Sequence, residues 1–252
     1  MVKILTIEKK GNKYIVCTNK NEYKFTEDVI IKYIITKNKE YTIEDFNEIV
    51  SFSKKSEFYN KVLNFLSYKD RSVKEVREYL VSKDCAITEE IIDDLISKKL
   101  LDDYRYANSY LESCNNNLKG PFYLKKELTN KGIDEATINE VLSNYNYNLI
   151  TDNLNLLIDK ELRKEKLVSF NKYKNQLTTK FLRLGFKLND INQVINDRKN
   201  ELLDVIDELS SLEKEYSKLE TKNLSKDKLI AKLISKGFKY TDILDVVSNY
   251  SK

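Results

Sequence analysis

The sequence lacks histidine altogether, and this absence excludes several classes of enzyme. Without histidine there is no Ser-His-Asp or Cys-His nucleophile system, no His-containing zinc site and no histidine general base. A glycine-rich phosphate loop is also missing, because no two of the five glycines lie within ten residues of each other. Carboxylate-only or lysine chemistry stays open at this point. We predict a protein that is not an enzyme and has no catalytic residue, metal site or cofactor.

Residues that interrupt helices are scarce, with one proline and five glycines in 252 residues, and 33% of the residues are charged. This composition favours long, solvated helices over a sandwich or a doubly wound sheet. The three cysteines, Cys17, Cys85 and Cys114, have no metal-like or redox spacing and are typical of reduced thiols in a cytosolic protein. No charged-then-apolar leader and no apolar run near ~18 residues is present. We therefore expect a cytoplasmic, monomeric protein without a membrane partner.

The N-terminal residues differ from the rest of the chain. A β-branched, apolar run at residues 2–7 is followed by two further strand-like runs, at residues 14–18 and 23–25, and turn sequences separate the three. They predict a three-stranded antiparallel meander that packs against a neighbouring helix, because such a meander is marginal alone. Thr42 to Asp45 fits a capping box at the start of a helix. Ser51 to Ser56 is a plausible joint between this helix and the next.

A repeat of about fifty residues then dominates the chain. Gly132, Gly185 and Gly237 are spaced by 53 and 52 residues, and the apolar residues around them match in position. The matching sets are Leu124, Leu177 and Leu229; Leu128, Phe181 and Leu233; Ile133, Phe186 and Phe238; Ile138, Ile191 and Ile243; and Val141, Val194 and Val246. Each glycine is expected to end one short helix in a left-handed conformation, before a second short helix begins. A degenerate copy has Asp84 in place of the glycine.

Longer amphipathic segments lie between these copies, at residues 104–114, 149–166 and 201–220. Each repeat is therefore predicted to contain one longer and two shorter helices. We predict a mainly α fold, with tandem three-helix repeats forming an elongated curved array and a small N-terminal antiparallel β meander. The predicted parts are an N-terminal meander with helices and four repeats: residues 1–54, 55–100, 101–147, 148–199 and 200–252.

Two alternatives compete with plain helical packing. The short helices around Gly132 resemble a helix-turn-helix, but no obvious base-reading side chains accompany them. Residues 201–220 place apolar side chains at nearly heptad spacing, which allows a coiled-coil dimer, although the segment is shorter than three full heptads. The first, longer helix of the last repeat is the preferred interpretation of that segment.

Basic residues cluster locally even though the net charge is only +4. Between Lys160 and Lys187 there are nine Lys or Arg residues against two glutamates. Smaller clusters surround Arg71 and Lys125. Solvated lysine faces are the usual explanation for such clusters. The alternative is a basic stripe that lines a concave surface and suits phosphates or an acidic protein groove.

Three passages resemble the RecX family of regulatory proteins. They are Asn64–Tyr68 with Asp70–Val76; Leu101–Ala107; and Lys119–Pro121 with Lys125–Leu128 and Lys131–Ile133. The order and spacing of these passages are similar to the family pattern, over about residues 60–195. The N-terminal meander and the fourth repeat resemble the longer members of the family.

The resemblance implies a non-enzymatic modulator of the RecA recombinase, built from tandem three-helix repeats. Such proteins bind RecA, usually inhibit its activities, and are thought to lie in the groove of the RecA–DNA filament. The expected partners are thus RecA and the RecA–DNA filament, with weak direct DNA binding as a further expectation. The residues expected to face the filament are Arg71, Lys74, Arg77, Arg105, Lys119, Lys125, Lys126, Lys131, Lys180 and Arg183. Two alternatives stay open: a helical scaffold that binds an unrelated protein, and a nonspecific nucleic-acid binder that acts without RecA.

Overall fold

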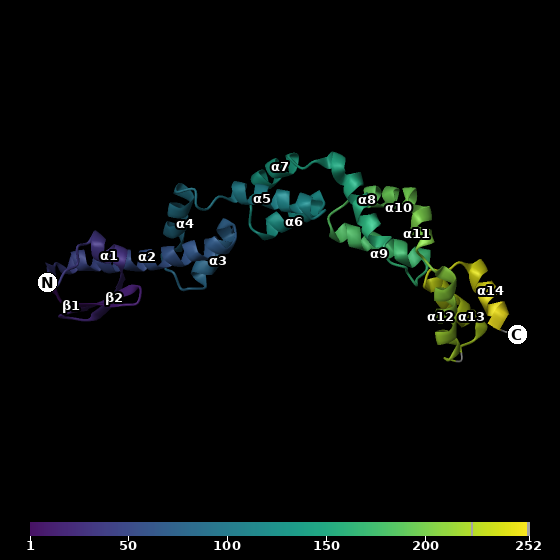
Figure 1. Cartoon of the computed structure of the whole chain (residues 1–252), viewed down its shortest axis with the longest axis horizontal. Coiled ribbons are helices and arrows are strands. Elements are labelled where there is room, and N and C mark those ends of the chain that lie inside the picture. The colour runs from purple at the N-terminus through teal and green to yellow at the C-terminus, as the bar shows by residue number, and fades with distance from the viewer. Residues whose placement is uncertain (223, 251–252) are drawn as a thin grey trace. The chain divides into compact units, whose positions relative to one another are not determined.

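The computed structural model describes residues 1–222 and 224–250, which are helical apart from one small sheet near the N-terminus (Figure 1). The chain divides into two compact units, described separately below. The first contains residues 1–106 and 131–133, and the second contains residues 107–130 and 134–252. The prediction of a mainly α protein with a small antiparallel sheet is confirmed.

The sheet of the first unit has four antiparallel strands in the order β3-β2-β1-β4. The elements of this unit are β1 (Val2–Lys10), β2 (Lys13–Thr18), β3 (Glu22–Thr26), α1 (Glu27–Lys32), β4 (Glu40–Tyr41), α2 (Ile43–Tyr68), α3 (Val73–Val81), α4 (Thr88–Ser97) and the first turn of α5 (Asp103–Asn116). The three predicted strands are confirmed. The fourth, β4, was missed because two residues are too few to show the alternation of a strand.

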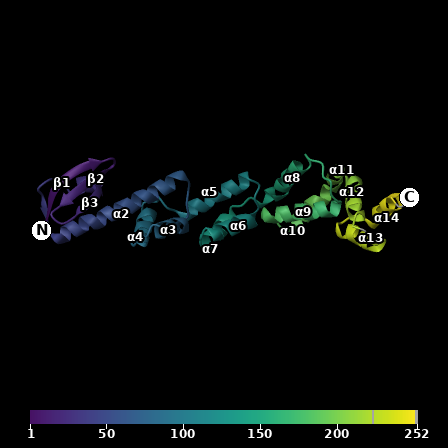
Figure 2. The same ribbon diagram turned by 90° about the horizontal axis from the view of Figure 1, so that it is seen from below.

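Helix α2 is continuous, so the predicted joint at residues 51–56 is wrong. This segment contains neither glycine nor proline, and serine and lysine are tolerated inside a helix. The first half of α2 contributes Phe46 and Ile49 to a hydrophobic core shared with the sheet. Its second half contributes Val62 to a separate core formed with α3 and α4. Figure 2 shows α2 extending from the sheet to these two helices.

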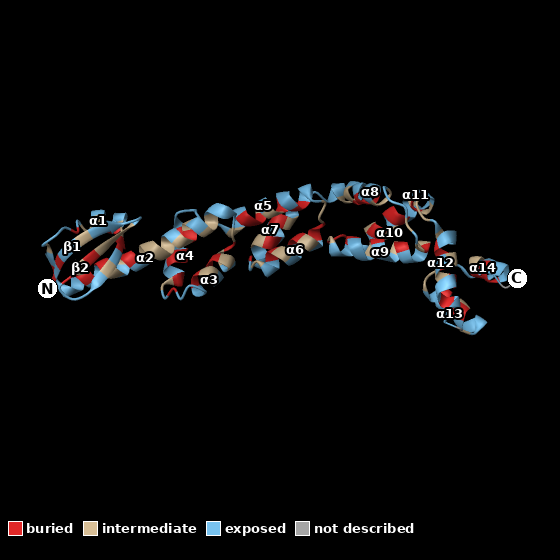
Figure 3. Cartoon of the chain, turned by 60° about the horizontal axis from the view of Figure 1, so that its bottom comes forward, coloured by how far each residue is buried: buried red, intermediate tan, exposed pale blue. Residues whose placement is uncertain are grey.

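The second unit consists of the remaining helices. They are the rest of α5, α6 (Pro121–Asn130), α7 (Glu135–Ser143), a short 3₁₀ turn (Tyr147–Leu149), α8 (Ile150–Glu161), α9 (Phe170–Arg183), α10 (Leu188–Asp197), α11 (Lys199–Asp204), α12 (Glu208–Glu220), α13 (Lys226–Ser235) and α14 (Tyr240–Tyr250). One core joins α8, α9 and α10, and another joins α12, α13 and α14. Figure 3 shows buried residues on the helix faces that meet within each three-helix group. No helix in the described residues is long and apolar enough to cross a membrane.

The single helix predicted over residues 201–220 is wrong, because the chain breaks between α11 and α12. The backbone of Lys166 causes this break: its N–H donates to the Val205 carbonyl at 2.8 Å, and its carbonyl accepts from Asp207 N–H at 3.1 Å. The Asp207 side chain then caps α12. Leu202 consequently packs in the α8–α10 core, whereas Leu212 packs in the α12–α14 core. The heptad spacing is thus divided between two cores, which argues against a coiled coil through this segment.

The repeated glycines have the predicted left-handed backbone. Their φ angles are 76° at Gly132, 90° at Gly185 and 90° at Gly237. Asp84, the predicted degenerate equivalent, also has a positive φ of 54°. Asp84 is exposed, and an aspartate tolerates this conformation better than most residues. The helix end is therefore the same at all four positions.

Close packing gives three of these positions a second reason for glycine. A Cβ on Gly185 would lie 2.2 Å from the Tyr123 backbone nitrogen, and one on Gly237 would lie 2.8 Å from Ser169 Oγ. A Cβ on Gly132 would lie 2.6 Å from Lys74 Cδ. In each case the second helix of the preceding repeat begins against the glycine-containing turn of the next repeat.

A hydrogen bond forms at each of these close approaches. Its acceptor is the carbonyl of the residue just before the glycine. Ser72 Oγ donates to the Lys131 carbonyl and Ser169 Oγ to the Lys236 carbonyl, both at 2.7 Å. In the middle case the backbone N–H of Gly120 donates to the Leu184 carbonyl, also at 2.7 Å. Gly120 replaces serine there because a Cβ would lie 2.2 Å from the Gly185 oxygen. The three contacts share the acceptor, which is the carbonyl of the residue just before a repeated glycine.

Candidate interaction surface

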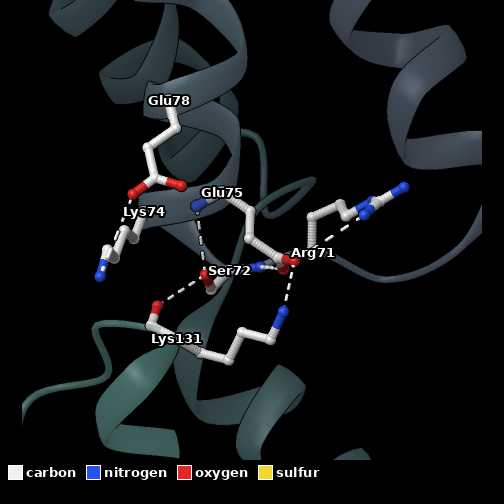
Figure 4. Close-up of polar contacts among 6 residues, drawn as sticks. All are labelled: Arg71, Ser72, Lys74, Glu75, Glu78 and Lys131. Carbon is white, nitrogen blue, oxygen red and sulfur yellow. Dashed lines mark hydrogen bonds and ion pairs between the residues drawn. The ribbon is translucent and has the colours of Figure 1, made fainter.

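Several of the predicted basic residues meet at the start of α3, within the first unit (Figure 4). Ser72 is the N-cap of this helix and forms a complete capping box with Glu75. The Glu75 carboxylate accepts from Lys131 Nζ at 2.6 Å and lies 3.8 Å from an Arg71 guanidinium nitrogen. Burial opposes the charged form of Glu75, but the hydrogen bonds from Lys131 and the Ser72 N–H outweigh it, so its pKa is lowered. This carboxylate is the centre of the cluster.

The other contacts of these cations are also intramolecular. The Arg71 guanidinium carbon lies 4.1 Å from the centre of the Phe65 ring, and its side chain is only 17% exposed. Lys74 lies 4.0 Å from the Glu78 carboxylate, and Arg77 makes two hydrogen bonds with Glu89, at 2.7 and 2.9 Å. Their charges are therefore already compensated within the protein. A filament-facing role for Arg71, Lys74, Arg77 and Lys131 stays a prediction, and these ion pairs do not favour it.

Arg105 lies in different surroundings, beside a cavity of about 300 Å³ in the first unit. Its guanidinium donates to the Lys99 carbonyl at 3.4 Å. The cavity wall also includes Arg71 and two acids, Asp70 and Asp102, so its charge is mixed. The neighbouring Tyr106 is buried, and burial raises its pKa to about 12. The cavity lacks the uniform charge expected of a phosphate or carboxylate site.

Three predicted cations lie around α6 in the second unit. Lys119 Nζ lies 4.8 Å from the centre of the Tyr123 ring, a cation–π contact. Lys125 and Lys126 are exposed on α6, and neither side chain forms an ion pair within the described part of the chain. These two lysines therefore remain available to an external anion.

The last two predicted cations, Lys180 and Arg183, belong to a groove of about 750 Å³ along α9. Two more basic residues line it: Lys172 on α9 and Lys236 just after α13. The sequence indicated the α9 cluster through its run of basic residues, but it could not place Lys236 there. That position results from the contact between Ser169 and the Lys236 carbonyl.

Apart from Leu184, the remaining lining of this groove is polar or small, and it includes no acidic side chain among the described residues. Asn171, Asn175 and Gln176 contribute amides, and the other lining residues are Thr179, Leu184, Ser235 and Gly237. Asn171 is already held by a 3.1 Å hydrogen bond to the Gly237 carbonyl. These amides were not predicted as site residues. The signal that could have found them is their helical spacing with the cations on one face of α9.

Two carboxylates outside the groove hold two of its lysines in place. Glu161 pairs with Lys180 and with Lys166, and Glu215 pairs with Lys236 and with Lys218. Burial opposes ionisation of Glu161, but these lysines outweigh it and lower its pKa. Hydrogen bonds from Lys236 and Lys218 lower the pKa of Glu215 to about 2. Lys172 and Arg183 form no ion pair within the described residues, so they give the groove its uncompensated charge.

Metal and thiol chemistry receive no support from the described residues. No group of three or more Cys, Asp or Glu side chains is arranged there to hold a metal ion. Cys85 and Cys114 are buried, and burial raises the pKa of Cys114 to about 11.

Comparison with known proteins identifies the family of this chain. Residues 59–98 match the sequence profile described as RecX, first three-helix domain, and residues 102–142 match RecX, second three-helix domain. A protein named Regulatory protein RecX from Streptococcus mutans is 31% identical over 258 residues, covering 99% of this chain and 100% of the relative. The chain belongs to the RecX family. A RecX protein from Streptococcus gordonii is also 31% identical, with the same coverage.

Solved RecX structures share the fold. One, described as regulatory protein RecX, covers 78% of this chain with a TM-score of 0.59 and 23% identity. RecX from Lactobacillus salivarius covers 57% of this chain with a TM-score of 0.50 and 33% identity. The two matched RecX profiles lie within the first two predicted repeats, which supports the three-helix organisation there. The α9 groove lies outside both profiles, in a part of the chain that the full-length RecX relatives cover.

Proposed function

We propose that this protein binds the RecA recombinase, as the free protein and in its filament on DNA, and inhibits its activity in recombination, repair and the SOS response. The observation that carries the proposal is similarity to a named RecX regulatory protein over 99% of the chain. Tandem three-helix repeats with exposed cations suit a large, anionic or polymeric partner. In this proposal the protein acts in the cytoplasm as a monomer and performs no chemical step itself.

Among the predicted contact residues, the exposed and uncompensated cations are the better candidates for binding. Lys125, Lys126 and Arg183 meet this description within the described residues. Arg71 and Lys131 do not, because both pair with Glu75. Moving either side chain to a partner would leave the half-buried Glu75 carboxylate with only one of its two cations. We therefore propose that the contact surface lies on α6 and α9.

The direct test is a titration of the full-length protein into the single-strand-dependent ATPase assay of the recombinase from the same organism. We expect the rate of ATP hydrolysis to fall as the protein is added. Binding of the protein to naked DNA is measured in parallel at the same salt concentration, because nonspecific binding to phosphates depends steeply on salt. Steep, salt-sensitive DNA binding without any effect on purified recombinase would favour the nonspecific nucleic-acid binder instead.

A charge reversal on α6 tests the proposed surface. The double variant Lys125→Glu/Lys126→Glu should inhibit the recombinase about tenfold less well than the unmodified protein, because two exposed attractive charges become repulsive. The matched control is Lys214→Glu/Lys228→Glu, which makes the same charge change at exposed positions on α12 and α13. Circular dichroism establishes that both variants are folded. Unchanged inhibition by the α6 variant would remove α6 from the contact surface.

A further inference from the structure

The groove on α9 has a charge distribution that the proposed function does not explain by itself. Its four basic side chains, Lys172, Lys180, Arg183 and Lys236, face a lining without any acidic residue among those described. From Lys172 to Arg183 the helix axis advances about 16 Å, at ~1.5 Å per residue. Lys180 and Lys236 are oriented by Glu161 and Glu215, and these acids do not line the groove. The groove thus presents a row of positioned cations to solvent.

The amides beside these cations indicate what kind of anion fits. Asn175 and Gln176 each present a donor and an acceptor, the pair of groups that a peptide bond also presents. Residues four apart on a helix are separated by about 6 Å along its axis. Alternate residues of an extended peptide are separated by about 6.6 Å. On α9, Lys172, Gln176 and Lys180 form one such row, and Asn175, Thr179 and Arg183 form the next. Along each row a polar side chain precedes or separates the cations, so an extended segment lying along α9 can bring side-chain carboxylates to the cations and its backbone to the amides.

A nucleic acid fits the same groove less well. Proteins that bind single strands stack the bases on aromatic side chains, and no aromatic residue lines this groove. Phosphates carry no hydrogen-bond donor at neutral pH, so the acceptor oxygens of Asn175 and Gln176 would have no partner in a phosphate backbone. A phosphate backbone would therefore use only the N–H groups of these amides, whereas a peptide backbone uses both the N–H groups and the oxygens.

We propose that the α9 groove binds an extended acidic segment of a protein partner, through Lys172 and Arg183 to carboxylates and through Asn175 and Gln176 to the peptide backbone, while Lys180 and Lys236 stay paired with Glu161 and Glu215 and line the same groove. This inference rests on the proposed function in one respect, because it takes the partner to be a protein. It does not require that partner to be a recombinase. The chemistry of the groove determines only an acidic, extended chain.

The test uses the full-length protein and a fluorescein-labelled peptide of alternating glutamate and serine, with binding followed by fluorescence anisotropy. The peptide should bind, and a glutamine–serine peptide of the same length should not. The variant Lys172→Glu/Arg183→Glu should bind the acidic peptide at least about tenfold more weakly. Both residues lack an ion-pair partner in the described residues, so their replacement should leave the fold intact. The control variant Lys214→Glu/Lys228→Glu should bind it as the unmodified protein does.

A second variant tests whether the groove distinguishes an acidic peptide from other polyanions. Asn175→Ala/Gln176→Ala keeps every charge of the groove, and it should weaken binding of the acidic peptide more than binding of a thymidine oligonucleotide. If the oligonucleotide bound more tightly than the peptide and depended on Lys172 and Arg183, the groove would be a nucleic-acid surface and the inference would be wrong. No binding of the acidic peptide to the unmodified protein would also overturn it.

The two proposals can fail separately. If the protein had no effect on the recombinase but its groove variants lost the acidic peptide, the proposed function would fail and the groove assignment would stand. If the protein inhibited the recombinase while Lys172→Glu/Arg183→Glu bound the peptide normally, the groove assignment would fail and the proposed function would stand. Measuring both quantities on the same preparations of the three proteins distinguishes these outcomes.

Discussion

Helices α3 and α9 are the second helices of the first and third repeats, and their basic residues meet opposite surroundings. Both begin at a fully buried serine, Ser72 or Ser169, whose hydroxyl donates to the carbonyl before a repeated glycine. At α3 the basic side chains form ion pairs with acidic residues of the same unit. On α9, Lys180 also pairs with an acid, Glu161, but Lys172 and Arg183 have no ion pair in the described residues, and the groove that they line contains no acid among those residues. Local charge density therefore does not separate a structural cluster from a binding surface, whereas the position of the acids does.

The left-handed turns that end the two helices differ in their packing, and this difference should give the largest effect. Replacing Gly185 by alanine places a Cβ against the Tyr123 backbone at a φ of 90°, and we expect a loss of about 3 kcal/mol in the free energy of unfolding. Asp84→Gly changes the equivalent, exposed position after α3 and should stay within about 1 kcal/mol of the unmodified protein. Urea denaturation followed by circular dichroism measures both. Equal stability of the two variants would show that the approach of Tyr123 to Gly185 is not required.

Removal of the carboxylate at the start of α3 should have the next largest effect. Glu75→Gln leaves Lys131 and Arg71 without their anion and weakens the capping box, so we expect a loss of about 2 kcal/mol. Glu78→Gln, on the same helix but with a side chain 65% exposed, should cost no more than about 0.5 kcal/mol. The same urea titration measures both variants. A Glu75 variant no less stable than the Glu78 variant would contradict the structural role of the α3 cluster.

The pH dependence of the free energy of unfolding should show how strongly Glu215 binds the groove lysine Lys236. Its partner Glu215 has a pKa lowered from 4.5 to about 2, so this ion pair stabilises the fold above pH 4.5 and is lost as the pH falls toward 2. Between these values Glu215→Gln should lose less stability than the unmodified protein. Glu165→Gln removes an exposed acid elsewhere in the second unit and should follow the unmodified curve. Parallel curves of the free energy of unfolding against pH for Glu215→Gln and the unmodified protein would show that the ion pair does not form in solution.

The smallest effect should come from two single arginines. Arg77→Gln loses two hydrogen bonds to Glu89, and we expect a cost of about 0.5 kcal/mol because the pair is solvent-exposed. Arg183→Gln should leave stability unchanged, since this side chain has no ion pair in the described residues. Thermal unfolding at low salt resolves the difference. A destabilised Arg183 variant would mean that this arginine supports the fold and is not free for a ligand.

Local features of the fold could be predicted from the sequence because they depend on neighbours along the chain. The left-handed ends at Gly132, Gly185 and Gly237 follow from glycine at a fixed distance after an apolar helix face. The break between α11 and α12 could not be found in this way. It depends on the backbone of Lys166, distant in sequence, and the segment contains no glycine or proline. The role of Gly120 was missed for the same reason, because only the approach of Gly185 requires it.

The candidate site could be predicted only as charge. Lys180 and Arg183 were found through the density of basic residues around α9. The pairing of Lys131 with Glu75 joins residues 56 positions apart, and nothing in the local pattern indicates it. Lys236 reaches the groove through a similar long-range contact, with Ser169. The sequence therefore predicts where basic residues cluster, but not which of them pair with an acid.

The continuity of helix α2 limits where the chain can be truncated. Its two halves belong to different hydrophobic cores, one with the sheet and one with α3 and α4. A truncation after residue 54 would cut this helix and leave its C-terminal part as a segment of about 14 residues, near the lower limit for a helix that is stable in water without partners. The shortened protein would also lose the Thr42 cap. Expression clones of the helical repeats should therefore begin before residue 42, which retains a part of the chain that belongs to the sheet.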